Sequence, residues 1–569
     1  MAGPIINPTT HSKNRLRNGL IRFCTFASFW SKVYLGLMNL SGIQKIVLGI
    51  LFFLAMAVRC IHINSPPFEY HPVRQFYSAL TARSLYQVET EEQTQKEKDI
   101  PRLVRNNLQP REPQILQTIV SWIYRLIGRE SFLVPRLISM SIWMVGGLFL
   151  LGLTRELFGP KGALSATAAY LFFPFGIHTS RAFMPESLMN ALFILALWMI
   201  FRYHKKPTVK GLLLAAGISG LAVLIKFVVL FPLAGAFLLS ALATSGLKKA
   251  VFDRRTFLFF LIIFLLGFPH YIFILFTSTA LKGTAKTLLL YLPHLLLRSF
   301  FWHGWLTQIG RVIGFIPLVF GLVSLALIRD KIHRWFLAGG FLGYFGYGLI
   351  FSYYTATHDY YHIALFTLIL TSSGYLAQKT GDRFFSVGNG KKGPFPIAIL
   401  ASVAAMILFL SYITADLDIL NREAKVRLGI ASTILCGNQL YYSYGEKRVF
   451  WDSQENNKRI TTAKEIGRLL DYNTKSFFLA RDYGFPLMYY SRIAGVFWPN
   501  TVDLGVYRLR GTPDLSIEER LARYADLNAE FFIVEDMQEW IKQPDLQRFL
   551  RKNYRLAWEK ENYLIFRMR

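Results

Sequence analysis

The sequence predicts an α-helical polytopic membrane protein of about eleven transmembrane helices, followed by a small C-terminal α/β domain. Of its 569 residues, 53% are hydrophobic and only 17% are charged, whereas soluble domains carry about 25% charged residues. Long apolar segments recur from residue 46 to residue 414, after which the composition is that of a soluble domain. We therefore divide the chain into a basic N-terminal segment (1–45), a transmembrane domain (46–414) and a soluble domain (415–569).

Eleven apolar segments have the length and hydropathy of a membrane-spanning helix. We predict spans at 46–63, 132–154, 162–180, 187–203, 211–225, 228–246, 256–277, 309–328, 335–354, 362–378 and 395–414. The first span follows a basic tail and lacks a small-residue cleavage site at the right distance. It is therefore expected to be a retained anchor, not a removed signal peptide.

The net charge of +29 is distributed as topogenic charge. Residues 1–45 contain six Lys or Arg and no Asp or Glu, and most other basic residues lie in alternate short loops. This distribution predicts a cytoplasmic N-terminus, an extracytoplasmic loop 64–130 and, after an odd number of spans, an extracytoplasmic C-terminal domain of an inner (plasma) membrane protein. The same distribution argues against nucleic-acid binding.

The C-terminal part alternates predicted strands and helices. Ser476–Ala480 and Phe531–Val534 are predicted as buried strands, and 461–471 and 516–527 as amphipathic helices, which indicates a small α/β domain. No Walker motif or zinc-ligand spacing occurs, so no metal site is predicted, although a divalent metal cofactor stays open. Three cysteines are too few to define a disulfide framework. They are Cys24, Cys60 and Cys436.

The first outer loop concentrates ionisable residues directly after the first span. The stretch Pro66–Tyr86 brings Glu69, His71 and Arg74 within six residues, beside Pro72. The apolar residues that follow have helical spacing and predict a helix on the bilayer surface with its polar side facing water. They are Val73, Phe76, Tyr77 and Leu80. The alternative is an ordinary polar loop, but ionisable groups at a membrane surface favour an active site.

The rest of this loop is expected to contain a solvated charged insert and a second surface helix. The insert covers residues 87–111, and the helix follows Arg111-Glu112-Pro113. The apolar face of the second helix is formed by Ile115, Ile119, Trp122, Ile123 and Leu126.

Four further polar groups are predicted at the same membrane face. They are Arg181 to Glu186, Lys226, the segment 279–308 with His294, Arg298, Trp302, His303 and Trp305, and Thr357 to His362. Each group has an alternative interpretation. Glu186 can cap the following helix, Lys226 can be an interfacial anchor, and residues 302–305 can form an aromatic belt.

Carboxylates and cations gathered at a bilayer surface suit the chemistry of a sugar carried on a lipid phosphate. Cations would hold the leaving phosphate, and a carboxylate would take the proton from the acceptor hydroxyl. The candidate phosphate ligands are Arg74, Lys226, His358 and Tyr361. The candidate catalytic bases are Glu69, as first choice, Glu112 and Glu186. Glu112 has a rival role as a bidentate partner that orients Arg74. Further expected site residues are His71, Arg181 and Asp359.

At these residues the sequence resembles the GT-C glycosyltransferases of the family often called family 39, which contains protein O-mannosyltransferases and the lipid A aminoarabinose transferase. The resemblance covers residues 46–414, and the C-terminal domain is similar to the outer domain of bacterial members. The motifs that carry it are the first-loop arginine cluster, Glu112-Pro113, Leu126-Ile127-Gly128, Val134-Pro135-Arg136-Leu137, Ser180-Arg-Ala-Phe-Met-Pro-Glu186, Leu224-Ile-Lys226 and His358-Asp-Tyr-Tyr361.

The resemblance implies a polyprenyl-phosphate sugar donor, a lipid, glycan or protein acceptor, inversion at the anomeric carbon and an outer-face active site. The chain departs from the family at two places. Many members carry an acidic pair about three residues before an arginine of the first loop, where this chain has His71-Pro72. The Glu112 position is often basic in the aminoarabinose transferases. Two other functions stay open: a transporter of lipid-linked or small anionic solutes, and a non-catalytic membrane scaffold.

Overall fold

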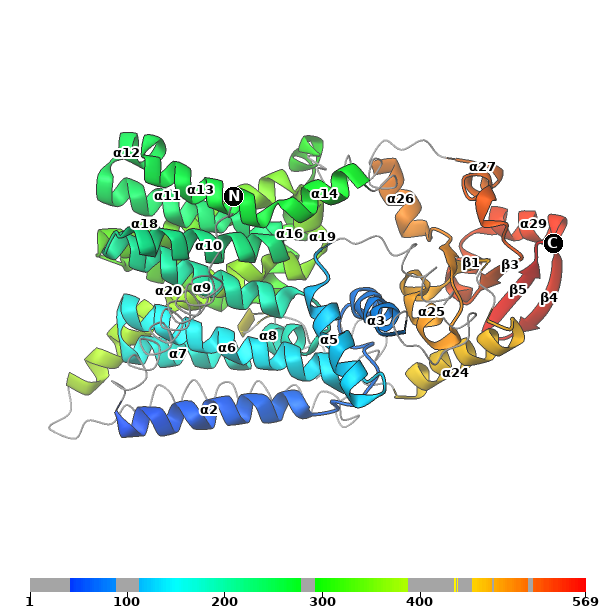
Figure 1. Cartoon of the computed structure of the whole chain (residues 1–569), viewed down its shortest axis with the longest axis horizontal. Helices are drawn as coiled ribbons and strands as arrows, with labels where there is room; N and C mark the ends of the chain where they lie inside the picture. The colour runs from blue at the N-terminus through cyan, green and yellow to red at the C-terminus, as the bar shows by residue number, and fades with distance from the viewer. Residues whose placement is uncertain are drawn as a thin grey trace, which may run out of the picture.

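The structure is a computed structural model that describes residues 41–87, 112–277, 292–386, 434–435, 437, 453–472, 475–509 and 515–569. It consists of a bundle of helices with a small sheet-containing domain at one end (Figure 1). The helix α3 (Pro72–Gln87) and the short helix α25 (Phe485–Ser491) lie between these two parts (Figure 1).

The predicted spans that lie within the described residues are helical, although several of them are divided into two helices or begin at other residues. The bundle helices are α2 (Gly42–Cys60), α6 (Leu133–Phe158), α7 (Pro160–Phe172), α8 (Pro174–Arg181), α9 (Glu186–Lys205), α10 (Val209–Ile225), α11 (Leu230–Ser245), α13 (Arg254–Gly267), α14 (Pro269–Thr277), α16 (Ser299–Val312), α17 (Phe315–Leu327), α18 (Lys331–Ile350) and α20 (Ile363–Ser386). Among the described residues, four helices are long and apolar enough to cross a membrane alone, and two bent pairs raise this number to six. The predicted span 395–414 lies outside the described residues.

Three predicted spans are broken rather than continuous, and each break has a local cause. The span 162–180 divides before Pro174, and the span 256–277 bends by 50° before Pro269, because a proline cannot donate the helical hydrogen bond. The span 309–328 begins ten residues early, at Ser299, and turns by 91°. Gly314 at this turn has a φ of 82°, a conformation that favours glycine.

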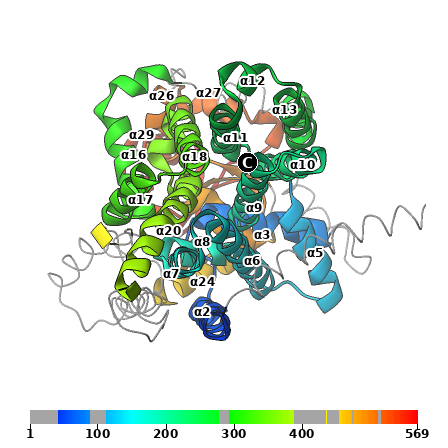
Figure 2. The ribbon, with the colours of Figure 1, turned by 90° about the vertical axis from the view of Figure 1, so that its left-hand side faces the viewer.

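Small residues allow two bundle helices to approach closely. A Cβ added at Gly235 of α11 would lie 2.1 Å from the carbonyl oxygen of Gly339 of α18, and the reverse substitution meets the same distance. This is the close backbone packing that small residues provide in membrane bundles. Figure 2 shows α11 and α18 side by side, with α2 at the edge of the bundle.

The spacing predicted that α3 lies on the bilayer surface with its polar side facing water. This prediction is wrong for the polar side, which is buried. Ten of the sixteen residues of α3 are buried, including polar Gln75 and Thr81. They are buried because the bundle and α5 (Ile115–Ile127) contact α3 from one side and the C-terminal domain covers the other. The helix α5 has the predicted surface position, since Trp122 and Leu126 are exposed while Val120 and Tyr124 are buried.

The C-terminal domain is built on a five-stranded mixed sheet with the order β2-β1-β3-β5-β4. The strands are β1 (Ser476–Leu479), β2 (Gly495–Phe497), β3 (Phe531–Val534), β4 (Arg555–Lys560) and β5 (Tyr563–Arg567). The strand β1 pairs in parallel with β2 and β3, and β5 pairs antiparallel with β3 and β4. The two predicted strands are therefore confirmed as central neighbours.

Each face of this sheet buries a different set of side chains. Phe478, Ile533 and Ile565 share a core with Phe76 and Leu80 of α3, and with α24 (Ser453–Leu469) and α25. On the other face, the alternate residues of the same strands pack against α28 (Met537–Ile541) and α29 (Pro544–Asn553). Side chains on one face of the sheet thus pack against α3 and hold this part of the loop 64–130 in place.

Polar contacts between Arg83, Glu130 and Tyr489, here called the polar node, also hold α3 against the C-terminal domain. Nε of Arg83 on α3 donates to both carboxylate oxygens of Glu130, at 3.0 and 2.9 Å. Nη1 of Arg83 donates to the carbonyl oxygen of Tyr489 at 2.7 Å, and its guanidinium lies 3.7 Å from the centre of the Tyr489 ring. The hydroxyl of Tyr489 donates to Glu130 at 3.2 Å, so three segments of the chain meet at one node.

Candidate active site

The polar groups predicted at the outer face gather at the end of the bundle nearest the C-terminal domain. They come from the loop before α3, the start of α3, the residues before α5, the first turns of α6 and α9, the residue after α10, and the turn between α19 (Ser352–Thr357) and the 3-10 helix η3 (Asp359–His362). Figure 1 shows α3, α5, α8 and α19 together at this end. Helix ends far apart in the chain are thereby combined into one cluster.

The ring of Tyr360 is the centre of this cluster. Nζ of Lys226 lies 4.3 Å from the centre of the Tyr360 ring and 4.6 Å from that of Tyr361. The guanidinium carbon of Arg74 lies 6.0 Å from the Tyr360 ring, and the His71 ring centre lies 4.9 Å from it. Two cations and an imidazole thus surround one aromatic ring, a favourable placement for cations.

Arg74 forms the predicted pair with Glu112. Its Nη2 donates to both carboxylate oxygens, at 2.7 and 2.9 Å. Burial is the largest single effect and lowers the pKa of Arg74, but Glu112, with smaller contributions from Tyr360, Glu186 and Tyr361, raises that pKa well above its usual value. Arg74 is therefore a permanent cation, oriented by Glu112.

Lys226 forms a buried ion pair with Glu186. The distance from Nζ to Oε1 is 2.5 Å, and the two side chains are 3% and 0% exposed. Glu186 is the first residue of α9 and the acidic residue of its first turn, so the pairing with Lys226 comes in addition to a favourable position at a helix N-terminus. Its Oε2 is buried and has no hydrogen-bond partner within the described ranges.

Glu69, the first choice for the base, is held in a separate group of arginines. It pairs with Nη2 of Arg136 and lies 3.8 Å from Nη2 of Arg181. Its side chain is 4% exposed. The guanidinium groups also donate to carbonyl oxygens of the segment that leaves α2, Arg181 to Ile61 and Arg136 to Ile63. Glu69 thus joins the first loop to α6 and α8.

Arg136 is the residue of this group that was not among the candidate site residues. It is 1% exposed and lies in the first turn of α6. The signal available in the sequence was an arginine directly after a proline at the start of an apolar span, within Val134-Pro135-Arg136-Leu137. A charge at that depth requires a partner, and the partner is Glu69.

His71 and Asp359 form a pair at the edge of the cluster. Nε2 of His71 lies 2.6 Å from Oδ1 of Asp359, and the hydroxyl of Tyr70 donates to the same oxygen at 3.4 Å. His71 has a φ of 44°, which is uncommon for a residue other than glycine. Its carbonyl oxygen accepts the first two hydrogen bonds of α3, from the backbone N–H groups of Arg74 and Gln75.

His358 lies beside the cations without adding a positive charge. Burial, with a smaller contribution from His71, lowers the pKa of His358 to about 3. The hydroxyl of Thr357 donates to the carbonyl of Tyr353, so it accepts from Nδ1–H of His358, at 2.7 Å. Nε2 of His358 is therefore unprotonated, and the ring is neutral.

The described part of the segment 279–308, residues 292–308, contributes little to this cluster. In its described part, Trp302 is 44% exposed, as an aromatic-belt residue would be. Trp305 is buried and donates to the hydroxyl of Tyr344 at 2.7 Å. Over the described ranges, no group of three or more His, Cys, Asp or Glu residues is arranged to hold a metal ion.

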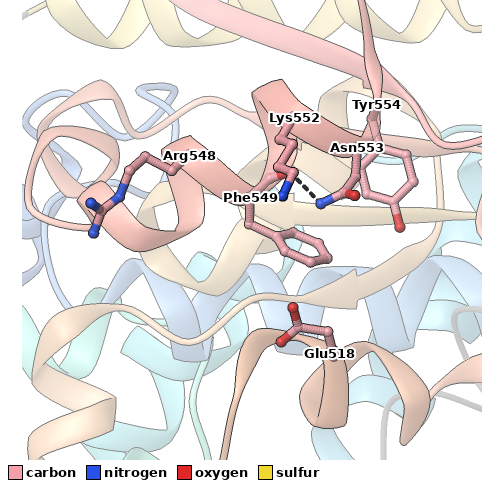
Figure 3. A pocket seen from close by; sticks show the side chains of 6 residues that line it. All are labelled: Glu518, Arg548, Phe549, Lys552, Asn553 and Tyr554. Carbon is pink, nitrogen blue, oxygen red and sulfur yellow. Dashed lines mark hydrogen bonds between the residues drawn. The ribbon is translucent and has the colours of Figure 1, made fainter.

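An open pocket of about 680 Å³ lies on the C-terminal domain, apart from this cluster. Figure 3 shows its lining residues, Glu518, Arg548, Phe549, Lys552, Asn553 and Tyr554. Most of them belong to the end of α29, which packs on the sheet face that is turned away from α3. The pocket therefore has no contact with the residues around Tyr360.

Comparisons with known proteins give the cluster a context. No curated protein matches the sequence. The family model described as "Dolichyl-phosphate-mannose-protein mannosyltransferase" matches residues 112–273, a segment that contains Glu112, Arg136, Arg181, Glu186 and Lys226.

Three solved structures are similar to this chain, and the first of them shows a shared fold. The apo crystal structure of ArnT from Cupriavidus metallidurans matches with a TM-score of 0.53 and 12% identity, over 92% of this chain and 98% of that chain. The structure of the same protein bound to undecaprenyl phosphate has a TM-score of 0.48, 12% identity and the same coverage. The Archaeoglobus fulgidus oligosaccharyltransferase, in complex with Zn and sulfate, has a TM-score of 0.44 and 12% identity, over 86% of this chain and 68% of that chain.

The apolar helices and the ArnT-like fold make this chain a multi-pass membrane protein. Residues 112–273, less than half of the chain, match the model of the dolichyl-phosphate-mannose-protein mannosyltransferases, so over this segment the chain is similar to that family of glycosyltransferases.

Proposed function

We propose that the protein transfers a sugar from a polyprenyl-phosphate donor to a lipid, glycan or protein acceptor at the outer face of the membrane. The observation that carries this proposal is the placement of Arg74 and Lys226 around Tyr360, at the buried end of a membrane bundle. The sugar–phosphate bond of a lipid-linked donor lies close to the membrane surface, where these cations are found. The family supports the same donor class, because dolichyl-phosphate-mannose is a sugar on a polyprenyl phosphate.

The two cations are suited to a leaving phosphate. The phosphate ester becomes a more highly charged polyprenyl phosphate as the glycosidic bond breaks. Arg74 offers a guanidinium fixed by Glu112, and Lys226 offers a point charge that Glu186 neutralises. A bound phosphate would compete with Glu186 for Lys226. Tyr361 completes this phosphate site beside Lys226.

The proposal includes the arrangement in the membrane. We propose about eleven spans, a cytoplasmic segment 1–45, a transmembrane domain 46–414 and an extracytoplasmic domain 415–569. The protein would then lie in the inner (plasma) membrane. The shorter and bent helices of the bundle would complete the set of spans beyond the six that length and composition identify.

The test uses the full-length chain in lipid nanodiscs, a panel of polyprenyl-phosphate monosaccharides, and membranes from cells lacking the gene as the acceptor source. Mass spectrometry should show release of polyprenyl phosphate together with a glycosylated product. Charge-assisted hydrogen bonds contribute about 1.5–3 kcal/mol each. We therefore expect Arg74→Ala and Lys226→Ala to lower turnover by roughly 10–100-fold, and to affect turnover more than donor binding.

The same assay separates the alternative functions. Movement of an intact lipid-linked sugar across the bilayer without bond cleavage would indicate transport. Binding of undecaprenyl phosphate without any product from the whole panel would indicate a non-catalytic membrane scaffold. The matched control is Arg202→Ala, which removes a cation from a pair with Glu156 at the opposite end of α9 and should leave turnover unchanged.

A further inference from the structure

The three carboxylates expected to supply a base are each occupied by a cation. Glu69 pairs with Arg136, Glu112 with Arg74 and Glu186 with Lys226. A general base must reach the acceptor hydroxyl within about 3 Å. Glu69 and Glu186 are 4% and 0% exposed, so an acceptor has no access to them. Both oxygens of Glu112 accept from the same guanidinium nitrogen.

His71 is more accessible than any of the paired groups. Its side chain is 29% exposed, compared with 17% for Glu112 and 11% for Asp359. Among the described residues, only Nε2 of the His71 ring makes a hydrogen bond. A carboxylate can only accept, so Asp359 fixes the tautomer in which Nε2 carries the hydrogen. Nδ1 is then unprotonated and can accept a proton.

The position of His71 relative to the cations suits a base. The edge of the His71 ring meets the Tyr360 ring, with the ring centres 4.9 Å apart and the ring planes at 86°. The same tyrosine ring contacts Lys226 and lies near Arg74. A base must stand beside the reacting carbon while the cations hold the phosphate, and this ring places the two functions next to each other.

The backbone holds His71 in a conformation that the chain would not adopt freely. Its φ of 44° is left-handed, and the next residue is Pro72, which further restricts the residue before it. The start of α3 maintains this geometry, because two backbone N–H groups of α3 donate to the carbonyl of His71. Such strain concentrates at functional positions.

Resting on the proposed function, we infer that His71 is the general base of the transfer and that Asp359 is its positioning residue. Nδ1 of His71 takes the proton of the acceptor hydroxyl while the oxygen of that hydroxyl forms a bond to the anomeric carbon of the donor sugar. The bond between that carbon and the phosphate oxygen breaks, and its electron pair leaves with polyprenyl phosphate. The His71 imidazolium is stabilised by Asp359 and returns its proton to the released phosphate or to water.

Four titratable groups face the His71 ring, and they favour this assignment. Asp359 stabilises the protonated ring, and the hydroxyls of Tyr70 and Tyr360 are neutral at ordinary pH. The fourth group, His358, is a weaker base because burial lowers its pKa to about 3. Of the two neighbouring imidazoles, His71 is the one that a carboxylate supports and that an acceptor can approach.

The test measures kcat against pH in nanodiscs with the donor that the wild-type protein cleaves, and donor-site binding with undecaprenyl phosphate by native mass spectrometry. His71→Gln should lower kcat by roughly 10²–10⁴-fold and change undecaprenyl phosphate binding by less than about twofold, since it leaves the phosphate cations in place. Asp359→Asn should also lower kcat, because an amide permits the wrong tautomer.

A pH profile distinguishes a base from a structural residue. Wild-type activity should fall on the acid side of the profile, because a protonated His71 cannot take the proton of the acceptor hydroxyl. In the double variant His71→Glu/Asp359→Asn, part of the activity should return, and the acid limb should move toward the carboxyl range of about 4. The control is His333→Gln, another histidine near an aspartate, Asp330; His333 lies in the first turn of α18, at the end of that helix away from α19.

The outcomes separate this inference from the proposed function. If His71→Gln retains wild-type kcat while Lys226→Ala loses it, the function stands and His71 is not the base. The same holds if His71→Gln loses undecaprenyl phosphate binding as well as kcat, or if the pH profile of the double variant keeps the wild-type acid limb. If the wild-type protein cleaves no donor of the panel, the proposed function itself fails.

Discussion

Among the described residues, two buried carboxylates form ion pairs that are almost completely removed from solvent. Glu69 with Arg136 and Glu186 with Lys226 have side chains no more than 4% exposed. Taking charges out of water costs several kcal/mol per ion, and removal of one partner leaves the other uncompensated. At the scale of the single residue, removing one partner of these pairs is therefore expected to cost more stability than the same substitution in an exposed pair.

Glu69→Gln is expected to act on stability. The neutral amide leaves the buried guanidinium groups of Arg136 and Arg181 without a carboxylate, so the free energy of unfolding should fall by about 3–5 kcal/mol. Thermal unfolding of the purified protein in detergent measures this change. The control Glu156→Gln removes one partner of a half-exposed pair with Arg202 and should cost about 0–1 kcal/mol. A Glu69→Gln protein that is fully stable but inactive would return the role of base to Glu69.

The sequence predicted which residues gather at one end of the bundle, because charges at membrane depth are rare and informative. It also suggested the Arg74–Glu112 pair. It could not assign Glu69 to Arg136 or His71 to Asp359, since those partners lie 67 and 288 residues apart. Such pairings depend on the distance between helix ends, and a single sequence does not contain that distance.

At the scale of the element, the helix α3 carries both the candidate site and the contact with the C-terminal domain. Arg74 lies in its first turn, and Arg83 lies near its end, in the node with Glu130 and Tyr489. The hydrophobic spacing correctly predicted a helix here, but it wrongly predicted that the polar side of this helix faces water. Periodicity reports which side of a helix is apolar, and it contains no information about a domain encoded 400 residues later.

Glu130→Gln should weaken the contact between α3 and the C-terminal domain. The loss of the carboxylate leaves the guanidinium of Arg83 partly buried without its charge partner, and we expect a loss of about 1.5–3 kcal/mol in unfolding free energy. Turnover should fall with it, because Arg74 lies on the same helix. Thermal unfolding and donor turnover are measured together, with Asp545→Asn, from a pair whose side chains are 80% exposed, as control. Unchanged turnover in a destabilised Glu130→Gln protein would show that the node does not position Arg74.

At the scale of the whole molecule, the site and the end of α20 lie at opposite ends of the bundle. The helix α20 begins at Ile363, directly after the Tyr360 cluster, and runs to Ser386 at the far end (Figure 1). If the site faces the outside, a reporter that is active only in an oxidising compartment should work when fused after Arg569. The same reporter fused at Gly388, which lies outside the described residues, should be silent. The reverse pattern would place the site in the cytoplasm.

The order of the strands has a consequence for how the protein is made. β5 (Tyr563–Arg567) is the last strand in the sequence, yet it lies between β3 and β4 in the sheet, and its Ile565 shares a core with Phe76 of α3. The ribosome therefore makes this support for the candidate active site only after all of the described bundle helices. A nascent chain that has not yet reached β5 would hold its membrane helices without a seated α3, so glycosyl transfer is expected to begin only after β5 has joined the sheet.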